Sequence, residues 1–207
     1  MCYTIRVLSF LAVAAAFGTA PVSGLGGQNQ PRDTAQANSA PAMIQQMAGT
    51  WGVSQRMWPG SGMQAIELPP AVAHRRLIGN VILQETMELA PGSKGEPFTR
   101  IAYIDYNAVN QQLEYFSIDT RAPQMMSETT YDPDAQRRLQ DQEEVILYGG
   151  SFVAPLWGEA KNAAFRYRLA IGKIQSNRQS IQLYLTPLSG ERVKEFLAFE
   201  YIYTRLQ

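Results

Sequence analysis

Cysteine and histidine are nearly absent from this chain. Its 207 residues include one cysteine, Cys2, and one histidine, His74. Disulfide frameworks and thiolate metal sites need several cysteines, and catalytic triads need a histidine beside a nucleophile. We therefore expect no disulfide, no metal and no cofactor. Any histidine chemistry would depend on His74 alone, which we interpret as an ordinary strand residue.

An excess of charge of either sign is also missing. Lys and Arg together number 18, as do Asp and Glu. The basic pairs Arg75-Arg76 and Arg137-Arg138 are isolated, so no cationic stripe is available to neutralise a row of phosphates. The acidic stretch at 132–134 lacks the repeated aspartate spacing of a calcium loop. We expect neither a nucleic-acid partner nor a calcium site.

The start of the chain has the pattern of a secretory signal. Arg6 precedes an apolar run at 7–17, and small residues follow as far as Gly24. The alternative is an uncleaved membrane anchor, but a bilayer-spanning helix needs about 20 apolar residues. We expect residues 1–24 to be cleaved together with Cys2. The mature protein would then be periplasmic or secreted, without stable membrane insertion.

The remaining chain divides into a linker and one domain. Residues 25–41 are rich in Gly, Gln, Asn, Ala and Pro and show no apolar periodicity, which is typical of a flexible linker. Residues 42–207 have the size of one domain with a sizeable core. The sequence therefore predicts a signal at 1–24, a linker at 25–41 and one domain at 42–207.

Strand patterns dominate that domain. Aromatic and branched residues alternate with polar ones, and turn residues separate the runs. A short helical segment is predicted at 42–48, and a polar loop or helical turn at 127–144. The patterns indicate about eight to ten antiparallel strands. The predicted strands are 51–58, 74–78, 81–89, 99–106, 112–125, 145–148, 164–174, 180–186 and 193–204.

So many consecutive strands must bury one face and protect their edges, by closing into a barrel or pairing into a sandwich. Met47-Ala-Gly-Thr-Trp51 resembles the opening of calycin barrels, which include the lipocalins and fatty-acid-binding proteins. The resemblance implies an all-β, antiparallel up-and-down barrel with a short N-terminal helix. It also implies that Arg205 of the final strand packs on Trp51 and joins the first strand to the last. A guanidinium over an indole contributes about 0.5–2 kcal/mol.

A closer resemblance is to an uncharacterised bacterial family of unknown function with a lipocalin-like barrel. Three segments carry it, at 47–58, 104–119 and 201–205, and with the strands between them it covers nearly all of 42–207. The hairpin departs from the family pattern, because it reads Asp105-Tyr106-Asn107 where such hairpins read Gly-Tyr-Asp. The family has no established activity to carry over.

Candidate site residues follow from strand alternation and from the barrel interpretation. Glu85 shares the apolar face of its strand, where an unpaired carboxylate would be costly, and Arg166 or Arg168 could pair with it. The alternative is that Glu85 lies near a strand end or bulge and stays solvated. The expected cavity residues are Trp51, Met57, Leu83, Glu85, Tyr103, Tyr115 and Arg168.

Three functions remain open from the sequence. The leading hypothesis is an exported lipocalin-like domain that binds a small, partly apolar ligand in its barrel, or a structural domain of that kind. A second is an enzyme, a hydrolase or isomerase, that uses Glu85 as a cavity carboxylate. A third is a protein-interaction module whose contact includes Trp58 or Trp157.

Overall fold

The computed structural model describes the chain over residues 39–79, 81–107, 109–110, 112–129, 144–154, 163–189 and 194–206. The expected signal peptide, most of the expected linker and Trp157 lie outside these residues. In the described part, no helix is both long and apolar enough to cross a membrane.

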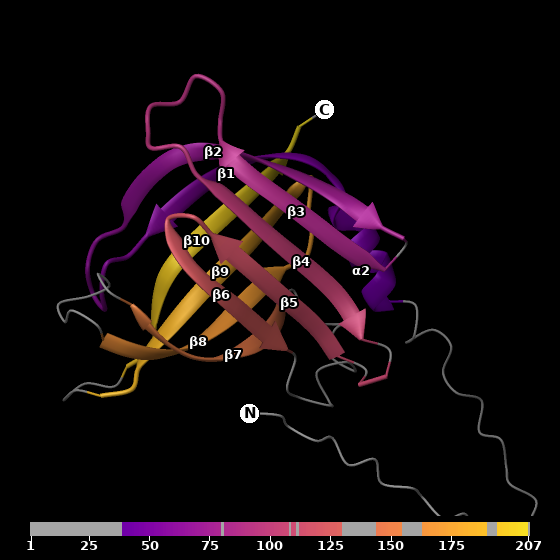
Figure 1. Cartoon of the computed structure of the whole chain (residues 1–207). Helices are drawn as coiled ribbons and strands as arrows, with labels where there is room; N and C mark the ends of the chain where they lie inside the picture. Colours follow the sequence, from indigo (N-terminus) through magenta and orange to yellow (C-terminus); the bar gives the residue numbers. More distant parts are fainter. Residues whose placement is uncertain are drawn as a thin grey trace, which may run out of the picture. The chain divides into compact units, whose positions relative to one another are not determined.

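The described strands close into a barrel (Figure 1). Each strand pairs with the next one in the sequence, and β1 pairs with β10 to complete the circle. The all-β, antiparallel up-and-down barrel with a short N-terminal helix is thus confirmed. The elements are α2 (Ser39–Met47), β1 (Gly49–Met57), β2 (Ile66–Ile78), β3 (Ile82–Leu89), β4 (Thr99–Asn107), β5 (Gln112–Asp119), β6 (Ala122–Thr129), β7 (Glu144–Ala154), β8 (Ala163–Gly172), β9 (Arg178–Pro187) and β10 (Phe196–Arg205).

Alternation explains which side chains form the core. On β1, Trp51, Val53 and Gln55 are buried, and the residues between them are more exposed. Helix α2 contributes Ile44 and Met47 to the same core, and both are fully buried. The helix therefore packs against the barrel end at which β1 begins and β10 ends. It begins at Ser39, three residues before the predicted segment.

Gly49 allows the helix to turn into β1. Its φ is +131°, a conformation that residues with a side chain rarely adopt. A Cβ at this position would lie 2.6 Å from Arg205 Nη1. Arg205 donates from Nη1 to the carbonyl oxygen of Ala48 at 2.6 Å, and from Nη2 to the carbonyl oxygen of Gln46. Gly49, the glycine of the Gly-x-Trp motif at 49–51, thus makes room for the arginine that joins β10 to the helix end.

Three strand predictions were wrong in their extent. The predicted strand at 112–125 is two strands, because Asp119 Oδ1 accepts a hydrogen bond from the Arg121 amide at 2.9 Å and forms a tight turn. The predicted 74–78 begins at Ile66, since Pro69 and Pro70 form a bulge of β2 opposite Ser54 of β1, where a proline need not donate to the ladder. The predicted 145–148 continues to Ala154 through a bulge.

Candidate functional site

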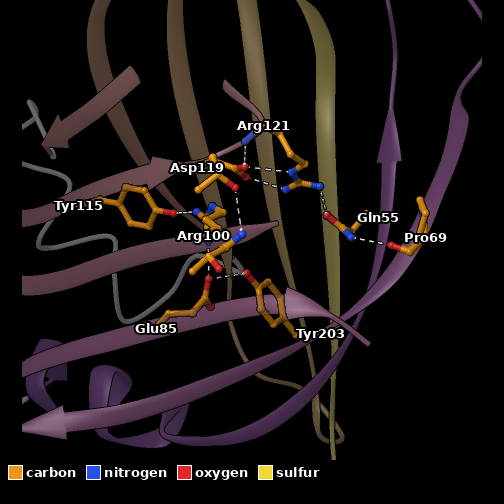
Figure 2. Close-up of polar contacts among 10 residues, drawn as sticks. Gln55, Pro69, Glu85, Arg100, Tyr115, Asp119, Arg121 and Tyr203 are labelled. Carbon is orange, nitrogen blue, oxygen red and sulfur yellow. Dashed lines mark hydrogen bonds and ion pairs between the residues drawn. The ribbon is translucent and has the colours of Figure 1, made fainter. Parts of the chain in front are cut away.

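The barrel interior contains a buried ion cluster centred on Glu85 of β3 (Figure 2). Arg75 of β2 donates from Nε to Glu85 Oε2 at 2.7 Å. Arg100 of β4 donates from Nη1 to Glu85 Oε1, and the Tyr203 hydroxyl of β10 donates to the same oxygen at 3.3 Å. All four side chains face inward, and both carboxylate oxygens of Glu85 accept hydrogen bonds from the other three.

Arg75 links this cluster to the barrel end at which β1 begins and β10 ends. Its Nη1 donates to Gln179 Oε1 on β9 at 2.6 Å. The guanidinium carbon lies 3.8 Å from the centre of the Tyr203 ring and 5.4 Å from that of Trp51. Arg205 lies 4.2 Å above the same indole. These cation–π contacts and hydrogen bonds connect strands that are far apart in the sequence.

A second polar cluster lies at the opposite barrel end, on the turn between β5 and β6. Arg121 donates from Nη2 to Asp119 Oδ2 at 2.6 Å and from Nη1 to Gln55 Oε1 at 3.0 Å. Gln55 Nε2 in turn donates to the carbonyl oxygen of Pro69 at 2.7 Å (Figure 2). Because β5 and β1 are not neighbours in the barrel, the Arg121–Gln55 bond joins separate parts of the wall. The Arg121 side chain remains 30% exposed.

Glu128 of β6 differs from every other buried carboxyl in the described residues. It is 1% exposed, and neither Oε1 nor Oε2 has a hydrogen-bond partner. Its directly paired neighbours are Tyr115 on β5, which is buried in the core, and Gly149 on β7, so Glu128 points into the barrel. Burial raises the pKa of Glu128 to about 8, with Arg100 opposing the shift.

The strands that carry Glu128 and Gly149 form the weakest seam of the described barrel. Among the described residues, β6 and β7 pair at two positions, Glu128 with Gly149 and Thr129 with Tyr148. At the next position the Tyr167 hydroxyl accepts a hydrogen bond from the Ser127 amide and donates one to its carbonyl oxygen, both at 3.2 Å. A side chain of β8 thus replaces the missing strand partner.

Gly149 leaves the space that Tyr167 occupies. A Cβ on Gly149 would lie 2.1 Å from the Tyr167 ring. Burial raises the pKa of the Tyr167 hydroxyl, and the Glu128 carboxyl raises this pKa further. The seam is defined here by Ser127, Glu128, Gly149 and Tyr167. It combines short strand pairing, a tyrosine ring in the space beside Gly149, and a carboxyl without hydrogen-bond partners.

Glu85 and Glu128, the two buried glutamates that face the barrel interior, have opposite electrostatics. Burial alone would raise the pKa of Glu85, but the adjacent guanidinium groups of Arg75 and Arg100 hold it below its ordinary value. Glu85 is thus a permanent anion at neutral pH. Glu128 has no ion-pair partner and keeps its proton, so it can donate one hydrogen bond and accept another.

The interior includes most of the residues expected to line a cavity. Trp51, Leu83, Glu85 and Tyr115 are buried there, and Met57 packs half-buried against the core. The alternative of a solvated Glu85 is wrong, because its exposure is 4%. Glu85 does pair with arginines, but these are Arg75 and Arg100 and not Arg166 or Arg168.

Arg168 and Tyr103 lie on the outer face of the barrel, which corrects two of the expected cavity residues. Arg168 donates from Nη2 to Glu195 Oε1 at 2.7 Å, and its guanidinium lies 3.9 Å from the centre of the Tyr184 ring. The Tyr103 hydroxyl accepts from Gln84 Nε2 at 3.0 Å. Tyr103 alternates with the buried Ala102 and Ile104, so the strand period itself directs it outward.

The sequence analysis did not predict three residues of the site, namely Arg75, Arg100 and Glu128. Arg100 alternates with Ala102 and Ile104, and this pattern could have identified it as an inward cation. Arg75 was considered only as half of an isolated basic pair, although adjacent strand residues point to opposite faces. Glu128 was assigned to a polar loop because Ser127, Glu128 and Thr129 carry no apolar signal.

The outer surface has its own hollow, of about 350 Å³, across β1, β2 and β3. His74 lies there with its Nδ1 3.4 Å from Thr50 Oγ1, and Arg76 donates from Nε to Gln84 Oε1 at 2.6 Å. These outward side chains already bond one another. Within the described residues, no group of His, Cys, Asp and Glu side chains could hold a metal ion.

Comparison of the sequence with known protein families and with curated proteins gives no match. Among solved structures, the barrel is similar to Rv2717c from M. tuberculosis, with a TM-score of 0.50 and 13% identity over 81% of this chain and 98% of that one. A redesigned β barrel aligns with a TM-score of 0.34 and 12% identity over 82% of this chain and 96% of the other. At this identity the likeness to Rv2717c shows a shared fold alone.

Proposed function

We propose that this barrel binds a small, partly apolar ligand in its interior, with Glu128 as the polar anchor. The observation that carries the proposal is the pair of buried Glu128 oxygens without hydrogen-bond partners. Leaving a buried polar group unsatisfied costs about 1–3 kcal/mol, and native proteins seldom do so without a reason. A bound ligand that completes these hydrogen bonds recovers that cost.

The chemistry around Glu128 supports a ligand with both polar and apolar parts. Tyr115 and Tyr167 flank the carboxyl, and Tyr167 belongs to an apolar cluster, the Tyr167 cluster, that includes Phe165 and Leu185. Small-molecule sites in proteins combine apolar walls with a few polar groups that set the ligand's orientation. The seam has this composition.

An enzyme that uses Glu85 is not favoured by any contact of that residue. Both of its oxygens are engaged by arginines and by Tyr203, and its pKa is held low. A general acid or base works best with a pKa near the working pH. Glu85 is better suited to joining strands than to moving protons.

We also propose that the chain is an exported, lipocalin-like protein of the periplasm or the medium, from an uncharacterised bacterial family. Support comes from the signal-like pattern before Gly24, from the Gly-x-Trp motif and from the up-and-down barrel order. N-terminal sequencing of protein from a bacterial host that expresses the full chain should find a start at or near Leu25. A start at Met1 would overturn the export proposal.

Native mass spectrometry tests the binding proposal. Protein purified without denaturation should carry a small noncovalent adduct that denaturation releases. Glu128→Leu should lose the adduct, and Glu88→Leu, on the exposed face of β3, should retain it. A bare mass for the wild type, together with no increase in Nile red fluorescence on mixing, would contradict a ligand-binding barrel.

A further inference from the structure

Glu128 restricts the chemistry of the group that it binds. Its two oxygens are both free of partners, and both lie inside the barrel. A protonated carboxyl presents one O–H donor and one carbonyl acceptor side by side. A head group that satisfies both must therefore offer an acceptor and a donor at the same spacing.

The charged and titratable groups around Glu128 disfavour a cation. Arg100 of β4 acts on the carboxyl through its charge, Tyr115 faces it from β5, and Tyr167 lies beside it from β8, whereas β7 contributes Gly149, which has no side chain. A cationic ligand would have to ionise Glu128 and would also be repelled by Arg100.

An anionic head group fits the carboxyl less well than a neutral one. A carboxylate ligand accepts hydrogen bonds but donates none, so it would satisfy the Glu128 O–H and leave the carbonyl oxygen unpaired. The described hydrogen bonds of Arg100 run to Glu85 and Tyr115 and do not reach Glu128. An amide provides a carbonyl acceptor and an N–H donor next to each other.

We propose that Glu128, as a neutral carboxyl, binds the amide group of a ligand whose apolar part lies against the Tyr167 cluster. This inference rests on the function proposed above, because it specifies the class of ligand at the same site. The apolar part would contact Tyr167, Phe165 and Leu185, which form one buried cluster with Ala198. No ionisation of ligand or protein is needed for such a complex.

Three probes that differ only in their head group test this assignment. Octanamide, octylammonium and octanoate are titrated into the wild-type protein by calorimetry between pH 6 and pH 9. Octanamide should bind at least tenfold more tightly than the other two at pH 7. Its affinity should be constant at low pH and fall above pH 8, by about tenfold per pH unit, because the binding form of Glu128 is then depleted.

Substitutions separate hydrogen bonding from shape. Glu128→Gln keeps one donor and one acceptor, so it should bind octanamide within about threefold of wild type and lose the pH dependence. Glu128→Leu should weaken octanamide at least tenfold. Glu88→Gln should change neither the affinity nor the pH profile.

Other outcomes overturn the inference in distinct ways. Tighter binding of octylammonium, with affinity that rises toward pH 8, would identify a cation site. Tighter binding of octanoate would identify an anion site. Equal binding of all three probes to wild type and Glu128→Leu would refute the role of Glu128 and leave a ligand-binding barrel. Binding of none of them, together with no adduct in native mass spectrometry, would overturn the proposed function as well.

Discussion

Two glutamates in the barrel interior are buried to a similar degree but are treated in opposite ways. Glu85 lies 4% exposed among two arginines and a tyrosine hydroxyl, whereas Glu128 lies 1% exposed with no hydrogen bond to either oxygen. At Glu85, the barrel therefore supplies hydrogen-bond partners for both oxygens of an inward carboxylate. The difference indicates that Glu85 joins strands through its ion pairs, and it is the basis for our proposal that Glu128 binds a ligand.

The largest effect is expected from removing the charge of the paired glutamate. Glu85→Gln leaves Arg75 and Arg100 buried without their common anion. Breaking a buried ion pair by removing one partner costs about 3–5 kcal/mol. Urea unfolding should show this loss, and Glu88→Gln on the same strand should stay within about 0.5 kcal/mol of wild type. Equal stability of the two variants would remove the distinction between the glutamates.

The unpaired glutamate should reveal itself in the pH dependence of stability. The folded-state pKa of Glu128 is raised from 4.5 to about 8, so this group stabilises the fold fully below pH 4.5 and loses that contribution as the pH rises toward 8. The slope is about 1.4 kcal/mol per pH unit.

Glu128→Gln has no such titration. Its free energy of unfolding, relative to wild type, should therefore increase by about 2–4 kcal/mol between pH 5 and pH 8. Chemical denaturation at several pH values measures the difference and cancels the contributions of other groups. A constant difference across this range would mean that Glu128 is ionised or paired in the folded state.

Gly49→Ala tests the packing that joins β1 to β10, at the barrel end where β1 begins. Alanine at φ +131° is strained, and its Cβ would meet Arg205 Nη1 at 2.6 Å. We expect a loss of about 2–3 kcal/mol in thermal or urea unfolding. Gly62→Ala is the matched control, because its φ is +77° but its Cβ would meet open space. An equal effect at both positions would show that Arg205 does not matter there.

The smallest effect is expected at the seam. Tyr167→Phe removes the hydroxyl that bonds the Ser127 amide and carbonyl, at a cost of about 1–2 kcal/mol. Hydrogen exchange of the Ser127 amide should accelerate, while amides in the middle of β3 keep their protection. Tyr184→Phe, which removes an outer-face hydroxyl bonded to Gln182, should leave the Ser127 amide unchanged.

Strand alternation predicted the antiparallel strands and part of the interior, and the resemblance of the 47–51 opening to calycin barrels favoured a barrel over a sandwich. Trp51, Leu83 and Glu85 were assigned to the inner face from a period of two, and they are buried. Alternation within one strand cannot identify partners on other strands, because pairing depends on the closed order of the barrel. Arg166 and Arg168 of β8 were therefore considered as partners of Glu85. Its partners are instead Arg75 on the adjacent β2 and Arg100 on the adjacent β4.

Glu128 could not be predicted because its strand lacks a hydrophobic pattern. The turn at Asp119 to Arg121 divides one apparent strand into two, and Ser127, Glu128 and Thr129 then read as a polar loop. Its burial comes from Tyr115 and Gly149 on neighbouring strands, and from Tyr167, which fills the space that Gly149 leaves. Tertiary contacts of this kind leave no local trace in the sequence.

The most direct test of the central claim is the titration of the Glu128 carboxyl carbon by NMR, with and without octanamide. In the free protein the resonance should titrate near pH 8, and with octanamide bound it should titrate at a higher pH, since the amide binds the protonated form. A Glu128 resonance that titrates below pH 5 and does not respond to octanamide would contradict the account.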